Sequence, residues 1–328
     1  MTYSVGGLIQ ASDFNAFAGD SSTGINRVYG AGSADYGYGQ SPELSSVSAS
    51  ATVTATNWAS LVSVISTVAS HQGTSITART QPVTGDVIAI LSAVATDITN
   101  CTTNRGNATA SGSEFTGWSG TSSKTTATGS GSAAWTITFT HTITWGSAAA
   151  ARYFFNCGGR IKWAVNKSST GTDADEEWND LASTLCGAIY ITGGTATQTI
   201  AGSSYTGTTQ SGGTGTPSTL ATTTGFHDLI TSDTVLYKQF ADTFPYTGQY
   251  IQLAAKTAGS GTQLVLTTTW YDPGNAGTGY ANSDISGGTA LSGVTFGTAP
   301  ATLVTFFYPS STYIADTWGS ETVVAGVA

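Results

Sequence analysis

The residue types that most often perform enzyme chemistry are sparse in this 328-residue chain, which has three histidines and nineteen acidic residues. His227 beside Asp228 is the one place where a histidine adjoins a carboxylate, and neighbours in sequence do not by that alone bring their side chains together. No G-x-S-x-G, phosphate-binding loop, H-E-x-x-H or paired-carboxylate motif occurs. We therefore expect no enzyme, no catalytic residue and no cofactor.

An acidic run between 173 and 177 allows two interpretations, and it consists of Asp173, Asp175, Glu176 and Glu177. A calcium loop would need the glycine and the distal glutamate of such loops, which this spacing lacks. Asp173 three residues before Glu176 instead matches a capping box that begins a helix. Trp178, Leu181 and Leu185 would then face inward, and whether the run also binds an ion stays open.

The three cysteines, Cys101, Cys157 and Cys186, are far apart and lack metal-ligand spacing. They indicate free thiols of a protein made in a reducing cytoplasm, with no disulfide and no bound metal.

The elements that must position any site are mainly strands, and the clearest is 135–145. Aromatic, aliphatic and histidine side chains alternate there with threonines without an exception. Successive strand residues point to opposite faces, so this is a strand of roughly 36 Å with one apolar face and one threonine face. His141 lies on the apolar face and is expected to be a core residue. A slip of one residue would expose the whole apolar set, so the register is strongly specified.

The threonine face of this strand, Thr136 to Thr144, has two interpretations. A regular hydroxyl-and-methyl lattice is what ice-binding surfaces use. Threonine is also simply suited to the wet face of a strand, or to a face packed against a neighbouring subunit, and we prefer that interpretation.

The first hundred residues show helical spacing at 8–18, 58–69 and 86–98. Their apolar stripes leave area that must pack on something else, for which a sister chain is one candidate. We therefore predict an assembly or docking face made of Phe14, Phe17, Trp58, Leu61, Ile65, Val87, Leu91 and Val94.

Beyond residue 134 the period is two almost everywhere, which predicts antiparallel strands. A hairpin is expected at 152–165, with a Cys-Gly-Gly turn. Further strands are expected at 188–192, 197–201, 235–240, 250–256, 263–271 and 301–308. The predicted fold is mainly β: an antiparallel β-sandwich-like domain at 134–328, preceded by a smaller helical attachment or oligomerisation region at 1–110. Residues 111–133 are expected to be a Gly/Ser/Thr-rich linker.

Composition restricts the kinds of partner that are expected for this chain. Only 9% of residues are charged, 41 are glycine, and the net charge is −9. Ten Lys and Arg residues that do not cluster argue against nucleic acid and anionic lipid as partners. No secretory signal and no apolar window long enough to span a bilayer is found, so no membrane insertion is expected.

Several short segments carry a resemblance. They are Ala-Ser-Asp-Phe-Asn-Ala at 11–16, the Tyr-Gly-x-Gly…Tyr-Gly-Tyr-Gly-Gln loop at 29–40, Ala-Thr-Asn-Trp-Ala-Ser-Leu at 55–61 with His71-Gln72-Gly73, Ala-Arg-Tyr-Phe-Phe-Asn-Cys-Gly-Gly-Arg-Ile-Lys-Trp at 151–163, and Glu-Trp-Asn-Asp-Leu at 177–181. Together they resemble virion structural proteins of tailed bacteriophages, notably those that infect cyanobacteria. The resemblance implies a tail, fibre or collar protein, assembled in the bacterial host cytoplasm, that acts by contact and carries no catalytic residues. Its implied partners are other virion proteins and itself, as a homo-oligomer for which a trimer is one candidate.

A different class of function competes with this one: a carbohydrate-binding or host-receptor module. Sugar rings stack on exposed aromatic faces, and the candidate contacts near loop tips are Trp118, Tyr205, Tyr271 and Tyr280.

Overall fold

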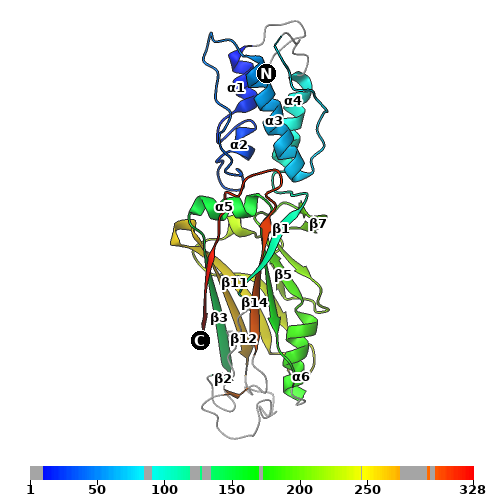
Figure 1. Cartoon of the computed structure of the whole chain (residues 1–328). Coiled ribbons are helices and arrows are strands. Elements are labelled where there is room, and N and C mark those ends of the chain that lie inside the picture. The colour runs from blue at the N-terminus through cyan, green and yellow to red at the C-terminus, as the bar shows by residue number, and fades with distance from the viewer. Residues whose placement is uncertain are drawn as a thin grey trace.

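The protein is described by a computed structural model over residues 10–84, 91–118, 126–127, 134–169, 173–244, 246–273, 294–295 and 300–328. It is mostly β, with antiparallel sheets and a few helices. The α-helices in the described residues are α1 Ala11–Ala18, α2 Asn26–Tyr29, α3 Ala55–Gln72, α4 Leu91–Thr103, α5 Ala148–Asn156 and α6 Asp173–Asp180. Helices α1 to α4 lie at one end of an elongated molecule, and the strands run along the rest of it (Figure 1).

The local sequence explains where α3 begins and ends. The Thr54 side chain accepts a hydrogen bond from the backbone of Asn57 at 3.3 Å, and the Asn57 side chain accepts one from the backbone of Thr54 at 2.9 Å. This reciprocal pair satisfies N–H groups that the first helical turn leaves open. At the other end Gly73 has φ +71°, a left-handed conformation that glycine adopts without a steric penalty.

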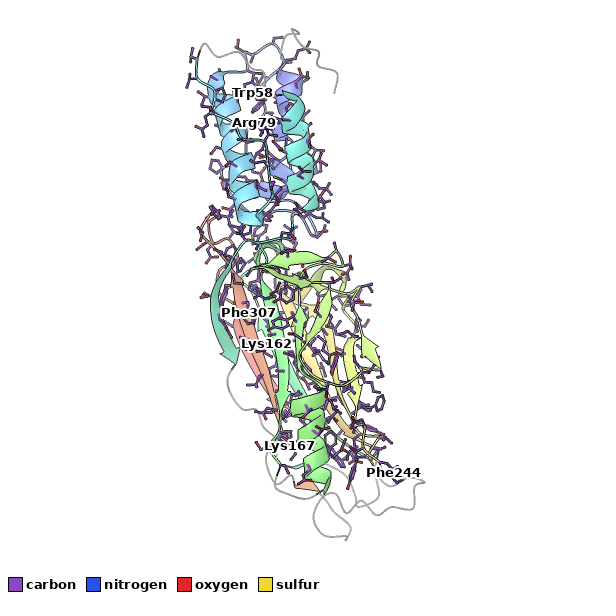
Figure 2. The ribbon with its side chains drawn as sticks, turned by 90° about the vertical axis from the view of Figure 1, so that its right-hand side faces the viewer. Trp58, Arg79, Lys162, Lys167, Phe244 and Phe307 are labelled. Carbon is purple, nitrogen blue, oxygen red and sulfur yellow. The ribbon has the colours of Figure 1, made fainter. Side chains whose placement is uncertain are left out.

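The helical end has a core of its own side chains around Trp58 (Figure 2). The rings of Phe14 and Phe17 from α1 lie 5.7 Å and 6.1 Å from the Trp58 ring, centroid to centroid. Arg79, which follows α3, forms a buried ion pair with Asp97 of α4. The apolar stripes of α1 and α3 are therefore covered within the chain.

Two larger sheets form the rest of the described structure. The five-stranded sheet has the order β1 Ser111–Trp118, β14 Ala301–Pro309, β4 Arg160–Asn166, β5 Ala188–Ile191, β8 Thr208–Ser211. The six-stranded sheet has the order β15 Thr322–Val327, β3 Trp135–Thr144, β12 Gln263–Asp272, β11 Tyr250–Ala258, β10 Thr234–Phe240, β9 Thr219–Leu220. Two further sheets have two short strands each: β13 Val294–Thr295 pairs with β2 Thr126–Ala127, and β6 Gln198–Ile200 pairs with β7 Ser203–Tyr205.

The face assignment for β3 is confirmed. Ile137, Phe139 and Ile143 are fully buried, whereas the threonines between them are half-buried or exposed. His141 is also buried, and burial lowers its pKa to about 4 because the charged imidazolium is poorly solvated there. Side chains of the two sheets meet in this core, where Trp163 Nε1 of β4 donates a hydrogen bond to Thr268 Oγ1 of β12 at 2.8 Å.

The outer face of the six-stranded sheet carries a second row of threonines. Thr267 and Thr269 of β12 pair in register with Thr140 and Thr138 of β3. Because neighbouring strands lie about 4.8 Å apart, the single row expected from the sequence becomes a two-strand threonine surface.

Most of the later strands are confirmed, and two expectations are wrong. The strands predicted at 188–192, 197–201, 235–240, 250–256, 263–271 and 301–308 correspond to β5, β6, β10, β11, β12 and β14. The predicted hairpin at 152–165 is instead helix α5 followed by β4. The Ser147 side chain accepts a hydrogen bond from Ala150 N and begins α5, and four alanines follow it, so a cap and good helix formers outweigh the aromatic run.

The expected linker at 111–133 begins with a strand. Residues 111–118 are β1, which pairs with β14 at the other end of the chain. Upstream of it, Ala108 N donates to the Thr199 carbonyl and the Ala108 carbonyl accepts from Ala201 N. The path from α4 into the sheet is therefore fixed by hydrogen bonds to distant segments.

The face assignment predicts unequal effects of two substitutions in β3. Phe139→Ala should lower the free energy of unfolding by about 3–5 kcal/mol, because it leaves a cavity in the core. Thr138→Ser on the outer face should cost well under half of that. Chemical denaturation of both variants measures the difference, and equal losses would show that the faces are assigned the wrong way round.

Candidate functional site

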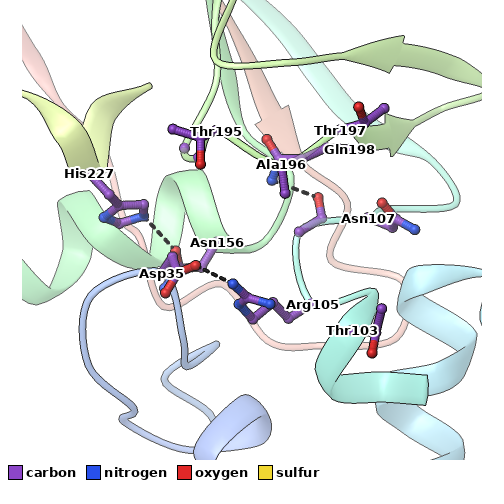
Figure 3. Close-up of a pocket in the computed structure, with 13 residues that line it drawn as sticks. Asp35, Thr103, Arg105, Asn107, Asn156, Thr195, Ala196, Thr197, Gln198 and His227 are labelled. Carbon is purple, nitrogen blue, oxygen red and sulfur yellow. Dashed lines mark hydrogen bonds and ion pairs between the residues drawn. The ribbon is translucent and has the colours of Figure 1, made fainter. Parts of the chain in front are cut away.

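Segments far apart in the sequence meet where the helical end joins the sheets. A small cavity of about 70 Å³ lies there. Figure 3 shows its lining: Asp35 from the loop after α2, Arg105 after α4, Asn156 at the end of α5, residues 193–198, and His227. Hydrogen bonds and an ion pair join these segments, so we take the junction as the candidate site.

Asn156 is the central polar group of the junction. Its Nδ2 lies 3.2, 2.9 and 3.0 Å from the carbonyl oxygens of Ala34, Tyr36 and Gly37. Its Oδ1 lies 2.8 Å from His227 Nε2. One buried amide thus holds the glycine-rich loop at 29–40 against α5.

His227 is held neutral with its proton on Nε2. Asn156 Oδ1 can only accept, so Nε2 must be the donor. Burial lowers the pKa of His227 to about 4. Asp228 does not face it as a catalytic partner: its Oδ2 accepts from Gly225 N at 2.9 Å and caps the short helix at Phe226–Asp228. The adjacent pair noted in the sequence therefore does not form an acid-base dyad.

Tyr36 lies between two arginines. The guanidinium carbons of Arg27 and Arg105 lie 3.4 Å and 4.1 Å from the centre of its ring. Arg105 also forms an ion pair with Asp35 (Figure 3). Cation–π contacts of this kind contribute about 0.5–2 kcal/mol each, so they add to the rigidity of the loop.

Tyr38 extends the network into the helical end. Its hydroxyl accepts from Gln72 Nε2 at 2.8 Å and donates to the Arg105 carbonyl at 2.7 Å. Its own carbonyl accepts from Thr317 Oγ1 at 2.6 Å. Desolvation raises the pKa of Tyr38 well above its usual value, so the hydroxyl stays protonated and keeps its donor.

Two further contacts cross the junction. His71 Nε2 lies 3.1 Å from the Cys157 carbonyl, and burial lowers the pKa of His71 to about 4. Gln40 makes two hydrogen bonds with the backbone of Ala315, donating from Nε2 at 2.9 Å and accepting at Oε1 at 2.8 Å.

The Cys157 thiol is fully buried and its pKa is raised well above the usual value by burial, so it is a poor nucleophile. The chemistry of this site is that of a structural clamp.

The predicted docking side chains are largely internal. Phe14, Phe17, Trp58, Leu61, Ile65 and Val94 are each at most 1% exposed. Leu91 begins α4, but its side chain lies outside the described residues, as does Val87 altogether. The helices cover one another within the chain, so the six buried side chains do not offer an apolar face to a partner.

The predicted receptor contacts are scattered. Tyr205 of β7 is 9% exposed and packs against Tyr190, at 5.3 Å between ring centres. Trp118 ends β1 with its side chain outside the described residues, and Tyr280 lies outside them entirely. Tyr271 is half-buried on the outer face of β12.

Tyr271 belongs to an aromatic ladder that sequence reasoning missed. The ladder consists of Phe240, Tyr250 and Tyr271, which lie side by side in register on β10, β11 and β12. Successive ring centres are 5.4 Å and 4.8 Å apart, and Lys238 Nζ lies 3.6 Å from the Tyr250 ring centre. The available signal was an aromatic at the same end of three predicted strands, but only strand pairing brings them together.

None of the helices in the described residues combines the length and the apolar composition that a bilayer crossing requires. Comparisons with protein-family models, with curated proteins and with solved structures find no match to this chain.

The two buried histidines, His71 and His141, and the partly buried His227 predict acid sensitivity. Each has a folded pKa of about 4 and an unfolded pKa near 6.5, so below pH 6.5 the unfolded chain binds more protons. Their full contribution to stability is present above pH 6.5 and is lost as the pH falls towards 4, by up to about 3 kcal/mol for each histidine.

The variant His227→Gln isolates the contribution of His227 to this loss of stability, because glutamine can still donate a hydrogen bond to Asn156. Denaturant midpoints between pH 7.5 and 4.5 should fall less steeply for the variant than for the parent chain. The titration of carboxylates is common to both proteins and cancels in the difference. Identical pH profiles would contradict a depressed His227 pKa.

Proposed function

We propose that this chain is a non-enzymatic structural component of a phage virion, most closely a tail-associated fibre, collar or baseplate appendage. It acts by self-assembly and by contact with neighbouring virion proteins. In this proposal the chain is an antiparallel β-sandwich-like domain that carries a smaller N-terminal helical region.

The observation that carries the proposal is where the resemblance segments meet. The loop at 29–40, the His71-Gln72 pair and the segment at 151–163 are distant in sequence, yet they supply the clamp at the junction. Tyr38 binds Gln72, His71 binds the Cys157 carbonyl, and Asn156 binds the loop. These motifs therefore fix the helical end against the sheets. A fixed angle between two ends is what a protein needs when it acts by its shape.

The surface composition supports assembly. An exposed sheet edge and apolar side chains on it favour pairing with another chain. Strand β15 is at the edge of the six-stranded sheet, and its Val324 and Val327 are 68% and 37% exposed. Beside it lies the threonine surface of β3 and β12, which has few charges to repel a second copy. We place the self-association surface here, in place of the buried helix stripes.

Self-association should therefore depend on the edge strand. In light scattering at micromolar concentrations the full chain should form a homo-oligomer, and Val324→Asp should shift it towards the monomer, because a carboxylate would be buried in the contact. Val83→Asp is the matched control: Val83 is 65% exposed but lies in the helical end.

A monomer at all concentrations would overturn self-assembly, and dissociation by Val83→Asp alone would move the contact to the helical end. Purified phage particles should contain the chain in several copies, and particles that lack it would overturn the virion assignment.

A carbohydrate or host-receptor module is the second candidate, and the aromatic ladder favours it. Three partly exposed rings and an ammonium group on one sheet face can stack on sugar rings and bind their hydroxyls. The rings lie at the strand ends directed away from the helical end (Figure 1).

Under this alternative the full chain should bind a subset of glycans on an array, and Tyr250→Ala or Tyr271→Ala should abolish the signal. Tyr313→Ala removes an equally large ring that is 50% exposed elsewhere and should leave binding intact. No glycan signal from the parent chain, or loss with Tyr313→Ala as well, would count against a ladder that binds sugars.

A further inference from the structure

Three carboxylates converge at the end of the sheets that faces away from the helices. Glu177 and Asp180 lie one turn apart on α6, and Asp242 lies two residues after the end of β10 at Phe240. One carboxylate oxygen from each residue lies within 4.8 Å of those from the other two. Among the ion pairs between described residues, none includes any of the three.

The spacing fits a cation of calcium size. Calcium–oxygen distances are about 2.3–2.6 Å, so ligand oxygens on one calcium ion are separated by up to about 5 Å. Magnesium, at about 2.1 Å, would require all three oxygens within about 4.2 Å and a stricter geometry.

A second observation is that one carboxylate oxygen of Glu177, Oε1, lacks a hydrogen-bond donor, although Thr243 hydrogen-bonds to this carboxylate. The residue is 5% exposed, and its Oε1 is buried without a hydrogen-bond donor. Leaving a buried carboxylate oxygen unpaired costs free energy, because water can no longer solvate it. Burial raises the pKa of Glu177, hydrogen bonds from Thr243 partly offset this, and the negative charges of Asp242 and Asp180 raise it further.

Packing of Trp178 and a backbone hydrogen bond hold the three carboxylates in place. Trp178, next to Glu177, packs between Trp135 and Trp270 at 5.4 Å and 5.5 Å between ring centres. The turn that carries Asp242 is closed by a hydrogen bond from Ala241 N to the Gln249 carbonyl at 3.0 Å. Asp242 itself is exposed and Asp180 is half-buried, which leaves a path from solvent.

We propose that Glu177, Asp180 and Asp242 bind one divalent cation of the calcium class, with water completing the coordination. The ion neutralises the carboxylates, supplies a partner for Glu177 Oε1 and ties α6 to the turn between β10 and β11. Only Glu177 comes from the acidic run at 173–177, so the site differs from a contiguous calcium loop. It does not depend on the proposed virion role.

Terbium luminescence tests this site directly in the full chain, since Trp178 lies next to a ligand and can sensitise a bound lanthanide. Terbium should give a tryptophan-excited signal that calcium displaces, and calcium should raise the melting temperature relative to a chelated sample. Asp242→Asn changes an exposed turn residue and should weaken calcium binding by at least about tenfold, the loss typical even of an outer-shell change. Asp180→Asn should do the same.

Glu176→Gln is the matched control, because it removes the same charge from the neighbouring, exposed position of α6. It should retain the binding and the melting shift of the parent chain. If calcium at millimolar concentration neither displaces terbium nor raises the melting temperature, the proposal is wrong. Equal binding by Asp242→Asn and the parent chain would also overturn it, as would an equal loss with Glu176→Gln, which would indicate only diffuse attraction.

Discussion

The burial of one face of β3 is the constraint on which both ends of the β region depend. At one end of the alternating segment the Trp145 ring lies 5.7, 5.8 and 6.2 Å from the rings of Phe154, Phe155 and Phe226. This packing fixes the position of α5 against the strand. At the other end Trp135 packs on Trp178, and this contact fixes the position of α6 against the strand. Each aromatic pair adds about 0.5–1.5 kcal/mol to the burial itself. A strand register that buries both tryptophans therefore also fixes the helix that carries Asn156 and the helix that carries Glu177.

The junction converts this packing into a defined angle between the helical end and the sheets. Most of its hydrogen bonds join a side chain to a backbone carbonyl or N–H of a distant segment, and the others join two side chains. Buried polar groups are costly unless each finds its partner, so such a network tolerates few alternative arrangements. His227 takes part in this network in its neutral state, since an imidazolium would be poorly solvated there. Rigidity of this kind suits a protein that works by shape and contact.

The two ends of the β region have different chemistry. The end near the helices is closed by reciprocal hydrogen bonds. The far end carries three carboxylates within 4.8 Å of one another, together with the aromatic ladder at the ends of β10, β11 and β12. Phe244, which is 66% exposed, lies at this far end as well (Figure 2). The far end thus combines clustered carboxylates, aromatic rings and an exposed phenylalanine, whereas the end near the helices is closed by polar contacts.

The sequence by itself determined the features that depend on local pattern. Strict alternation specified the faces of β3, helical spacing located the body of α3, and period-two segments located β10, β11, β12 and β14, because side-chain direction follows directly from backbone period. Tertiary structure decided what depends on pairing between distant segments. The aromatic run at 152–156 is helical because Ser147 caps it and the core accepts its rings, and residues 111–118 are a strand because β14 supplies their hydrogen bonds. The helix stripes are buried because α1 and α4 cover α3, whereas Asp242 meets Glu177 only because β10 ends beside α6. Contacts of this range leave no periodicity in the sequence, so they emerge only when the chain is folded.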